Sequence, residues 1–160
     1  MAKHHAIYEA VISTPVEGVK LGINTCNGVL DTIDFISSHH PDHAPSDGFI
    51  HQVIAQLCAY FRNPLYCFSL PFETHGTSFQ DRVWRVLQQI PSGASWSYGR
   101  VATYLNTSPR AVGGACRANP LPIVIPCHRV VAANGIGGFS GQTAGGRIVI
   151  KQWLLSHENG

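Results

Sequence analysis

The chain has 160 residues, of which 44% are hydrophobic and 12% are charged, and its formal net charge is +2. The hydrophobic share is ordinary for a globular protein with a core, whereas the charged share is about half of the roughly 25% that is usual. A net charge this small does not by itself predict nucleic acid as a partner, which would require the basic residues to gather on one face.

The cysteines and the lack of long apolar runs exclude other classes of protein. An odd set of five cysteines without a C-x-x-C pair argues against a disulfide framework and predicts reduced thiols. The start of the chain, Met1–His5, lacks the apolar core of a signal peptide. No apolar stretch approaches the roughly 18 residues that cross a bilayer. We therefore expect a soluble, cytoplasmic protein with no membrane partner.

The first part of the chain has the pattern of a small antiparallel sheet. Three hydrophobic runs, Ala6–Ile12, Val19–Ile23 and Val29–Ile36, are bounded by turn residues. Asn27 and Gly28 lie before the third run, and both tolerate the positive φ of a two-residue hairpin.

A loop, a helix and a linker follow this sheet. The polar stretch Ser37–Gly48 predicts a loop, and apolar residues at helical spacing from Ile50 predict a helix that ends near Arg62. Leu65–His75 has the pattern of an extended linker. We therefore place a domain boundary there, between residues 74 and 75.

The second part begins with a strong helix signal. Thr77-Ser78-Phe79-Gln80 has the form of a capping box, and apolar residues continue along one face as far as Ile90. Pro91-Ser92-Gly93 is expected to stop this helix.

Two shorter helices are predicted next. Apolar spacing predicts the first over Tyr98–Leu105, and Ser108 with Pro109 predicts the start of a second that runs to Ala118. Two short helices joined by a tight turn, here at Asn106-Thr107, are the pattern of a helix-turn-helix.

One face of the second helix is unusual. At about 100° per residue, Arg110, Gly113, Gly114 and Arg117 fall within a narrow arc. Glycines in a helix interior cost roughly 1 kcal/mol each, which suggests that the backbone must come close to something large, such as DNA. The alternative is that the glycines permit close helix packing and the arginines are merely solvated.

Cys127 is the candidate nucleophile. It follows the apolar, proline-bounded stretch Leu121–Pro126 and precedes His128 and Arg129. Proline stiffens this segment, and a neighbouring base or cation increases the share of reactive thiolate. His128 could be that base, directly or through a water. A structural cysteine and a cysteine hydrolase are the alternatives.

Two further segments close the chain. The glycine-rich stretch Asn134–Gly141 offers backbone donors and room for a flat ligand. Arg147–Glu158 predicts a helix with Ile150, Trp153, Leu154 and His157 on one face. Glu158 could orient a histidine, although a surface carboxylate is the simpler interpretation.

Together these pieces resemble the O6-alkylguanine-DNA alkyltransferase family (methylated-DNA–protein-cysteine methyltransferases). The resemblance covers about Phe79 to Glu158 closely and the first part in outline. Its motifs, in chain order, are Phe79-Gln80, Val83-Trp84, Ile90-Pro91-Ser92-Gly93, Tyr98, Arg110-Ala111-Val112-Gly113-Gly114-Ala115, Asn119-Pro120, Ile125-Pro126-Cys127-His128-Arg129-Val130-Val131 and Lys151-Gln152-Trp153-Leu154-Leu155.

The resemblance implies an α+β fold. Residues 1–74 would form a small antiparallel sheet with a helix, ribonuclease-H-like, and residues 75–160 a mainly helical, winged helix-turn-helix-like alkyltransferase domain. It also implies direct-reversal DNA repair, in which an alkyl group is transferred irreversibly from O6-alkylguanine to Cys127. O4-alkylthymine is an alternative lesion. The implied partner is the minor groove of double-stranded DNA with the alkylated base flipped out. No cofactor, metal or obligate protein partner is implied, and a monomer is expected.

The resemblance also assigns roles to residues. The implied catalytic residues are Cys127, His128, Glu158 and Asn119. The implied DNA-binding residues are Tyr98, Arg110, Ala111, Gly113, Gly114 and Arg117. The implied substrate pocket consists of Tyr98, Val130, Phe139, Ser140 and Gly141.

Three departures from the family pattern bear on these expectations. Phe139 stands where tyrosine is common, and Gln142–Gly146 is longer than usual. Some relatives bind zinc in the first domain, but His39, His40 and His43 with Asp42 lack convincing ligand spacing and are expected to form a solvated loop. A DNA-binding module without chemistry and a plain helix-turn-helix regulator remain the rivals, and each leaves Cys127 unexplained.

Overall fold

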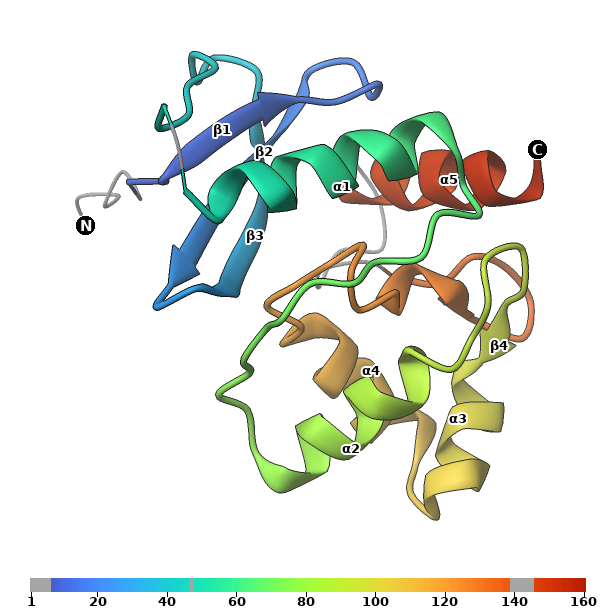
Figure 1. The fold of residues 1–160 in the computed structure, drawn as a ribbon. Helices are drawn as coiled ribbons and strands as arrows, with labels where there is room; N and C mark the ends of the chain where they lie inside the picture. The colour runs from blue at the N-terminus through green and yellow to red at the C-terminus, as the bar shows by residue number, and fades with distance from the viewer. Residues whose placement is uncertain (1–6, 47, 139–145) are drawn as a thin grey trace, which may run out of the picture. The chain divides into compact units, whose positions relative to one another are not determined.

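The computed structural model describes residues 7–46, 48–138 and 146–160, which belong to two compact units (Figure 1). The first unit is Met1–Glu73 and the second is Thr74–Gly160. The boundary expected from the sequence lies one residue further along the chain, and the independence of the two units as domains stays a prediction.

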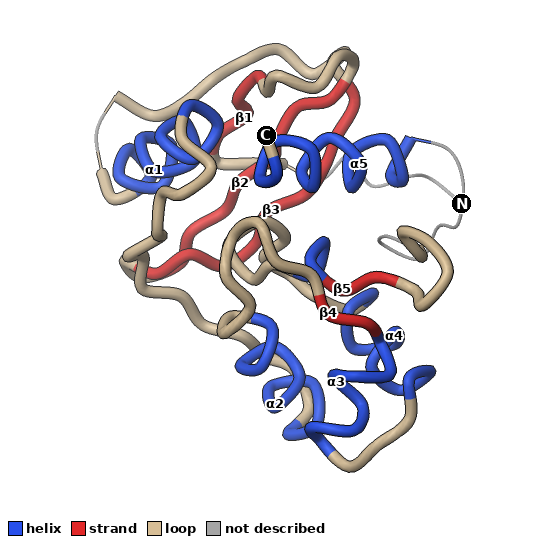
Figure 2. The backbone as a smooth tube through the Cα atoms, turned by 90° about the vertical axis from the view of Figure 1, so that its right-hand side faces the viewer, coloured by secondary structure: helices blue, strands red, loops and turns tan. Residues whose placement is uncertain are grey.

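The first unit is a three-stranded antiparallel sheet with one helix. The strands are β1 (Ala10–Ser13), β2 (Val19–Cys26) and β3 (Val29–Ser37), in the order β1-β2-β3. Helix α1 (Ile50–Arg62) lies on one face of this sheet (Figures 1 and 2). One side of the helix is buried, as the apolar spacing of its residues predicted.

The hairpin between β2 and β3 confirms the turn signal. Asn27 and Gly28 have φ of 52° and 79°, the left-handed values that a two-residue hairpin requires. β2 continues past Ile23 to Cys26 to reach this turn. The first strand was expected to start at Ala6, which lies outside the described residues. Among the described residues it starts at Ala10, because Glu9 donates its N–H to the Asn24 side chain and ladder pairing begins only after it.

The histidine-containing loop of the first unit is tied down by ordinary polar contacts. Asp42 Oδ1 pairs with Lys20 Nζ at 2.8 Å, and its Oδ2 accepts from Ser13 Oγ at 2.7 Å. The ring of His43 contacts the carbonyl of Tyr8 at 2.9 Å. Across the described parts of both units, no group of three or more His, Cys, Asp or Glu side chains is arranged to hold a metal ion.

The second unit is mainly helical. Its elements are α2 (Ser78–Leu87), β4 (Trp96–Ser97), α3 (Tyr98–Leu105), α4 (Pro109–Arg117), the 3-10 turn η1 (Cys127–Arg129), β5 (Val130–Val131) and α5 (Gly146–Asn159). β4 and β5 form a short parallel pair. The α+β class is therefore confirmed, whereas the ribonuclease-H-like and winged labels stay predictions. None of the helices in the described segments has the length and apolarity needed to cross a membrane.

Helix α2 begins as its sequence predicted. Thr77 Oγ1 accepts from Gln80 N at 3.1 Å, and Gln80 Oε1 accepts from Thr77 N at 2.9 Å, so both halves of the capping box are present. The helix ends at Leu87 and not beside Pro91, because Ile90 N–H bonds back to the Leu87 carbonyl in a tight turn. Ile90 is nevertheless fully buried.

Side chains of α2 hold the ends of the two helices that follow. Arg82 donates to the Leu105 carbonyl at the end of α3, at 3.3 Å, and Trp84 Nε1 donates to the Ala115 carbonyl near the end of α4, at 2.9 Å. Terminal carbonyls of a helix lack partners within the helix, so these bonds satisfy carbonyls near the ends of α3 and α4. A Cβ at Gly76 would lie 2.5 Å from the Trp84 ring, which explains glycine there.

The capping box gives a first prediction. Thr77→Ala should lower the free energy of unfolding of the second unit by about 1 kcal/mol, because a backbone N–H of α2 loses its acceptor. All three tryptophans lie in this unit, so urea unfolding followed by tryptophan fluorescence reports on it alone. Thr103→Ala, at an exposed position inside α3, is the matched control and should cause no loss. Equal stability of Thr77→Ala and wild type would contradict the role of the box.

Candidate functional site

Cys127 is buried at the start of η1, with 4% of its surface exposed. The segment before it is tightly folded, since Ile125 N–H bonds to the Leu121 carbonyl and Cys127 N–H to the Ile125 carbonyl, both at 2.8 Å. Ile123 has φ of 76°, a conformation that a β-branched residue rarely adopts and that costs about 1–3 kcal/mol. The thiol is therefore presented by a strained, rigid segment.

Burial raises the pKa of the Cys127 thiol, and two neighbours oppose this effect. The Asn119 side chain hydrogen-bonds the thiol, and the charge of Lys151 also favours the thiolate. Asn119 is itself fixed, because its Nδ2 donates to the Ile125 carbonyl and its Oδ1 accepts from Leu121 N, each at 2.9 Å. The structure thus brings the expected site residue Asn119 to the thiol.

His128 and Glu158 form the expected pair. His128 Nε2 lies 2.9 Å from Glu158 Oε2, and both side chains are buried. Burial lowers the pKa of His128 and outweighs the effect of the carboxylate, so the ring is neutral near pH 7. We therefore assign the ring proton to Nε2, facing the carboxylate. Nδ1 is then a free base, and it is buried with no hydrogen-bond partner among the described residues.

Arg129 is a member of this cluster that the sequence did not suggest. Its Nε and NH2 donate to the two oxygens of Glu158 at 2.9 and 2.8 Å, and its NH1 donates to the Ile90 carbonyl. Burial alone would raise the pKa of Glu158, but the hydrogen bonds from His128 and Arg129 lower it to about 2. The carboxylate is therefore ionised across the physiological range.

Lys151 is a second residue that the sequence did not suggest. The buried residues of α5 are Ile148, Ile150, Lys151, Leu154 and Glu158. Trp153 and His157 were expected to share a face with Ile150 and Leu154. Both are half-buried, and their rings stack with centroids 4.7 Å apart. Lys151 is fully buried, and its Nζ donates to the carbonyls of Val130 at 2.7 Å and Gly138 at 2.8 Å. Its seven-residue spacing from Glu158, two helical turns, was the signal that could have found it.

Tyr98, expected in the pocket, lies at the start of α3. Its hydroxyl donates to the Gly138 carbonyl at 3.3 Å, and burial raises its pKa to about 12, so it stays protonated. Val130 is buried beside Lys151. Three expected pocket residues lie outside the described residues: Phe139, Ser140 and Gly141.

Helix α4 presents the expected cationic face to solvent. Arg110, Gly114 and Arg117 are exposed, and Gly113 and Ala111 are half-buried. A Cβ placed at Gly113 or Gly114 would meet no atom within 4 Å. The alternative that these glycines serve close helix packing was therefore wrong, and they leave the outer surface of α4 unusually flat.

The inner side of the same helix faces the thiol. Val112 and Ala115 are buried, and Cys116 is half-buried near Cys127, since the two thiols influence each other's charge. Burial strongly raises the pKa of Cys116, which keeps it protonated. One helix thus has an exposed arginine face on one side and the buried Cys127 thiol near its other side.

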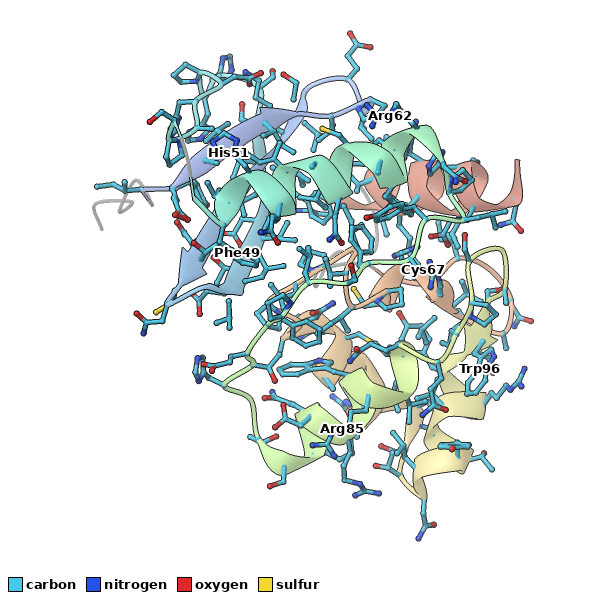
Figure 3. All side chains as sticks on the ribbon, viewed as in Figure 1. Phe49, His51, Arg62, Cys67, Arg85 and Trp96 are labelled. Atoms are coloured by element: carbon cyan, nitrogen blue, oxygen red, sulfur yellow. The ribbon has the colours of Figure 1, made fainter. Side chains whose placement is uncertain are left out.

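Charge is divided unequally between the two units. The second has eight Lys and Arg against two Asp and Glu, a net charge of +6, and the first has three against seven, a net charge of −4. Exposed arginines of the second unit include Arg85 on α2, which is labelled in Figure 3, and Arg100. The Arg100 guanidinium lies 3.9 Å from the centroid of the Trp96 ring. The modest net charge of the chain therefore conceals a strongly basic unit.

A buried cysteine followed directly by a histidine that pairs with a carboxylate, in a basic unit with two short helices joined by a tight turn, suits the class of proteins that act chemically on nucleic acid. Comparison with known proteins agrees. The family model described as "6-O-methylguanine DNA methyltransferase, DNA binding domain" matches residues 78–160. The chain belongs to this family of methyltransferases.

Individual relatives cover different shares of the chain. A methylated-DNA–protein-cysteine methyltransferase of Methanosarcina mazei is 33% identical over 159 residues, which span 95% of this chain and 97% of the relative. The similarly named protein of Mycobacterium leprae is 41% identical over 100 residues, so that the alignment spans 61% of each chain. The crystal structure of Mycobacterium tuberculosis OGT in complex with DNA is 34% identical, with a TM-score of 0.75, over 93% of this chain and 91% of that one.

The His128–Glu158–Arg129 cluster predicts how acid destabilises the second unit. Because the pKa of folded Glu158 lies near 2, below its ordinary value of 4.5, its contribution to stability is present above pH 4.5 and is lost as the pH falls towards 2. Between pH 4.5 and pH 2, protonation of this group should make the free energy of unfolding of the wild type fall by up to about 1.4 kcal/mol per pH unit. Glu158→Gln should remove this part of the slope in urea unfolding followed by tryptophan fluorescence.

The control for this measurement is Glu17→Gln, an exposed position in the first unit, which should keep the wild-type slope. A Glu158→Gln slope as steep as that of wild type would show that this carboxylate is not held ionised by its partners.

Proposed function

We propose that this protein repairs DNA by direct reversal, transferring an alkyl group from the O6 atom of guanine in duplex DNA to the sulfur of Cys127. The observation that carries the proposal is the buried Cys127 thiol, which shares one compact unit with the His128–Glu158 pair and with the cationic face of α4. Membership of the methyltransferase family supports the same reaction.

Recognition begins at the outer face of α4. Arg110 and Arg117 supply positive charge for phosphates, and the flat surface at Gly113 and Gly114 lets the helix backbone enter the minor groove. The alkylated nucleotide then flips out of the stack, which costs a few kcal/mol and less for a damaged base. Arg110 fills the vacated place, and the Tyr98 hydroxyl assists rotation of the nucleotide.

Chemistry follows in the pocket behind α4. The Cys127 proton passes to Nδ1 of His128, directly or through a water, and the ionised Glu158 stabilises the resulting imidazolium. The thiolate attacks the alkyl carbon, so a sulfur–carbon bond forms as the carbon–O6 bond breaks. Guanine leaves as its anion and regains a proton. The thioether is stable to hydrolysis, so each molecule acts once.

Substrate contacts come from the walls around the thiol. We assign these contacts to Tyr98 and Val130, which lie near Lys151, and to Phe139, Ser140 and Gly141. O6-alkylguanine is the main lesion, with O4-alkylthymine as the second candidate. The proposed compartment is the cytoplasm, where thiols stay reduced, in keeping with the five free cysteines.

Intact-mass analysis tests the reaction. Mixing the protein with a duplex containing O6-methylguanine should add one methyl group per protein, mapped to Cys127, because nothing regenerates the thiol. Cys127→Ala should bind the duplex without taking up the methyl group, and Cys26→Ala, at an exposed thiol of the first unit, should react like wild type. Turnover beyond one methyl group per molecule, or a tightly bound but unmodified wild type, would refute the proposal.

The flat face of α4 gives a second test. Gly114→Ala should raise the free energy of unfolding by about 0.5–1 kcal/mol, because alanine is the better helix former and its methyl group meets no atom. The same methyl group should lower affinity for duplex DNA several-fold by holding the helix out of the groove. Gly99→Ala on α3, which also has room for a methyl group, is the control for helix propensity. A Gly114→Ala protein that is more stable but binds duplex DNA as tightly as wild type would show that this face of α4 does not enter the minor groove.

A further inference from the structure

Lys151 is a buried cation whose counter-charge is not evident from its hydrogen bonds. Its side chain is fully buried, and its Nζ is fixed by two neutral acceptors, the Val130 and Gly138 carbonyls. The ammonium also lies 5.7 Å from the centroid of the Tyr98 ring. Burial of a charge is expensive unless an opposite charge lies nearby.

The carboxylates of the second unit do not supply that charge. Its sequence contains only two, Asp81 and Glu158. Asp81 accepts a hydrogen bond from Thr74, and Glu158 is held by His128 and Arg129. Within the described ranges, neither forms an ion pair with Lys151. Because the charges of Arg129 and Glu158 cancel, Lys151 is the one uncompensated charge beside the thiol among the described residues.

The backbone places Lys151 near the Cys127 thiol. Its ammonium is held by the carbonyl of Val130, the residue directly after η1, and helix α5 packs against η1. Burial lowers the pKa of Lys151 to about 8, and Cys127 opposes this more strongly than Cys116 does. Cys116 has a strongly raised pKa and stays protonated, and the raised pKa of Tyr98 keeps its hydroxyl neutral.

Burial raises the pKa of Cys127 as well, but Asn119 hydrogen-bonds this thiol and the unprotonated Nδ1 of the adjacent His128 can take its proton. Cys127 is therefore the group near Lys151 that can become its anion.

We propose that Lys151 is the counter-ion of the Cys127 thiolate, a positioning residue whose ammonium, clamped between the Val130 and Gly138 carbonyls, makes ionisation of the buried nucleophile possible. Two opposite charges attract far more strongly in a buried site than in water. With the thiol protonated the pocket carries a net positive charge, and with the thiolate it is neutral. His128 receives the proton and Lys151 stabilises the anion that remains, so the two residues have separate tasks. The inference relies on the proposed function only in taking Cys127 as the nucleophile.

The coupling can be measured without DNA. The chain has three lysines, Lys3, Lys20 and Lys151, so lysine labelled with carbon-13 at the ε position gives few signals to resolve by NMR. Cys127→Ser removes the anion and should move the titration midpoint of Lys151 to lower pH by about one unit or more relative to wild type. Cys116→Ser is the matched control and should leave the midpoint close to that of wild type. An unchanged midpoint in Cys127→Ser overturns the inference.

The reverse measurement follows the thiol. Mass spectrometry gives the rate at which iodoacetamide modifies Cys127 at each pH, with the exposed thiols of Cys26 and Cys67 as internal references. Lys151→Met should move the midpoint for Cys127 upward, with a rate at neutral pH roughly tenfold lower, and Lys151→Arg should restore part of the loss. Linkage requires the two shifts, of Lys151 and of Cys127, to be equal in size. Unchanged Cys127 kinetics in a folded Lys151→Met protein would also overturn the inference.

These outcomes separate the two proposals. If Lys151→Met does not fold, the comparison of wild type with Cys127→Ser still decides the counter-ion. Coupling between Lys151 and Cys127 without methyl transfer would contradict the proposed function and leave the counter-ion inference standing. Methyl transfer without this coupling would contradict the counter-ion inference and leave the proposed function standing.

Discussion

The Cys127 thiol is 4% exposed, and to act as the proposed nucleophile it must lose its proton in that buried place. Burial opposes this step, and each polar group around the thiol reduces the penalty in a different way. Asn119 donates a hydrogen bond, His128 offers an unprotonated Nδ1, and Lys151 brings a fixed charge. A buried thiolate also has a benefit, because solvent does not weaken it as a nucleophile.

Helix α5 organises this compensation. It carries Lys151 and Glu158 two turns apart on its buried side, so one rigid element places both the fixed cation and the carboxylate that holds His128. Helix α4 also lies near the thiol, with its arginines exposed and Cys116 on its inner side. The nucleophile is therefore supported by rigid helices, which hold catalytic geometry more firmly than loops do.

The sequence predicted the features that depend on neighbouring residues. The capping box at Thr77, the hairpin at Asn27-Gly28 and the start of α4 at Ser108 were all confirmed, because each is decided within about four residues. The family pattern brought Asn119, His128 and Glu158 to one site. Lys151 was missed because the Val130 and Gly138 carbonyls that hold it carry no signal in side-chain type. Arg129 was missed because its partners are the Ile90 carbonyl and Glu158, a carboxylate that the sequence assigned to His128 alone. The early end of α2 was missed for a similar reason, since buried Ile90 continues the apolar pattern beyond the helix.

The unequal division of charge has a consequence for how the protein meets a polyanion. A net charge of +6 on the second unit and −4 on the first means that an approaching duplex attracts one unit and repels the other. Encounters in the wrong orientation are thus discouraged before any contact forms, and productive encounters become more frequent at low ionic strength. For the single-use repair proposed above, this electrostatic steering would limit the time spent in unproductive collisions while the overall charge stays low.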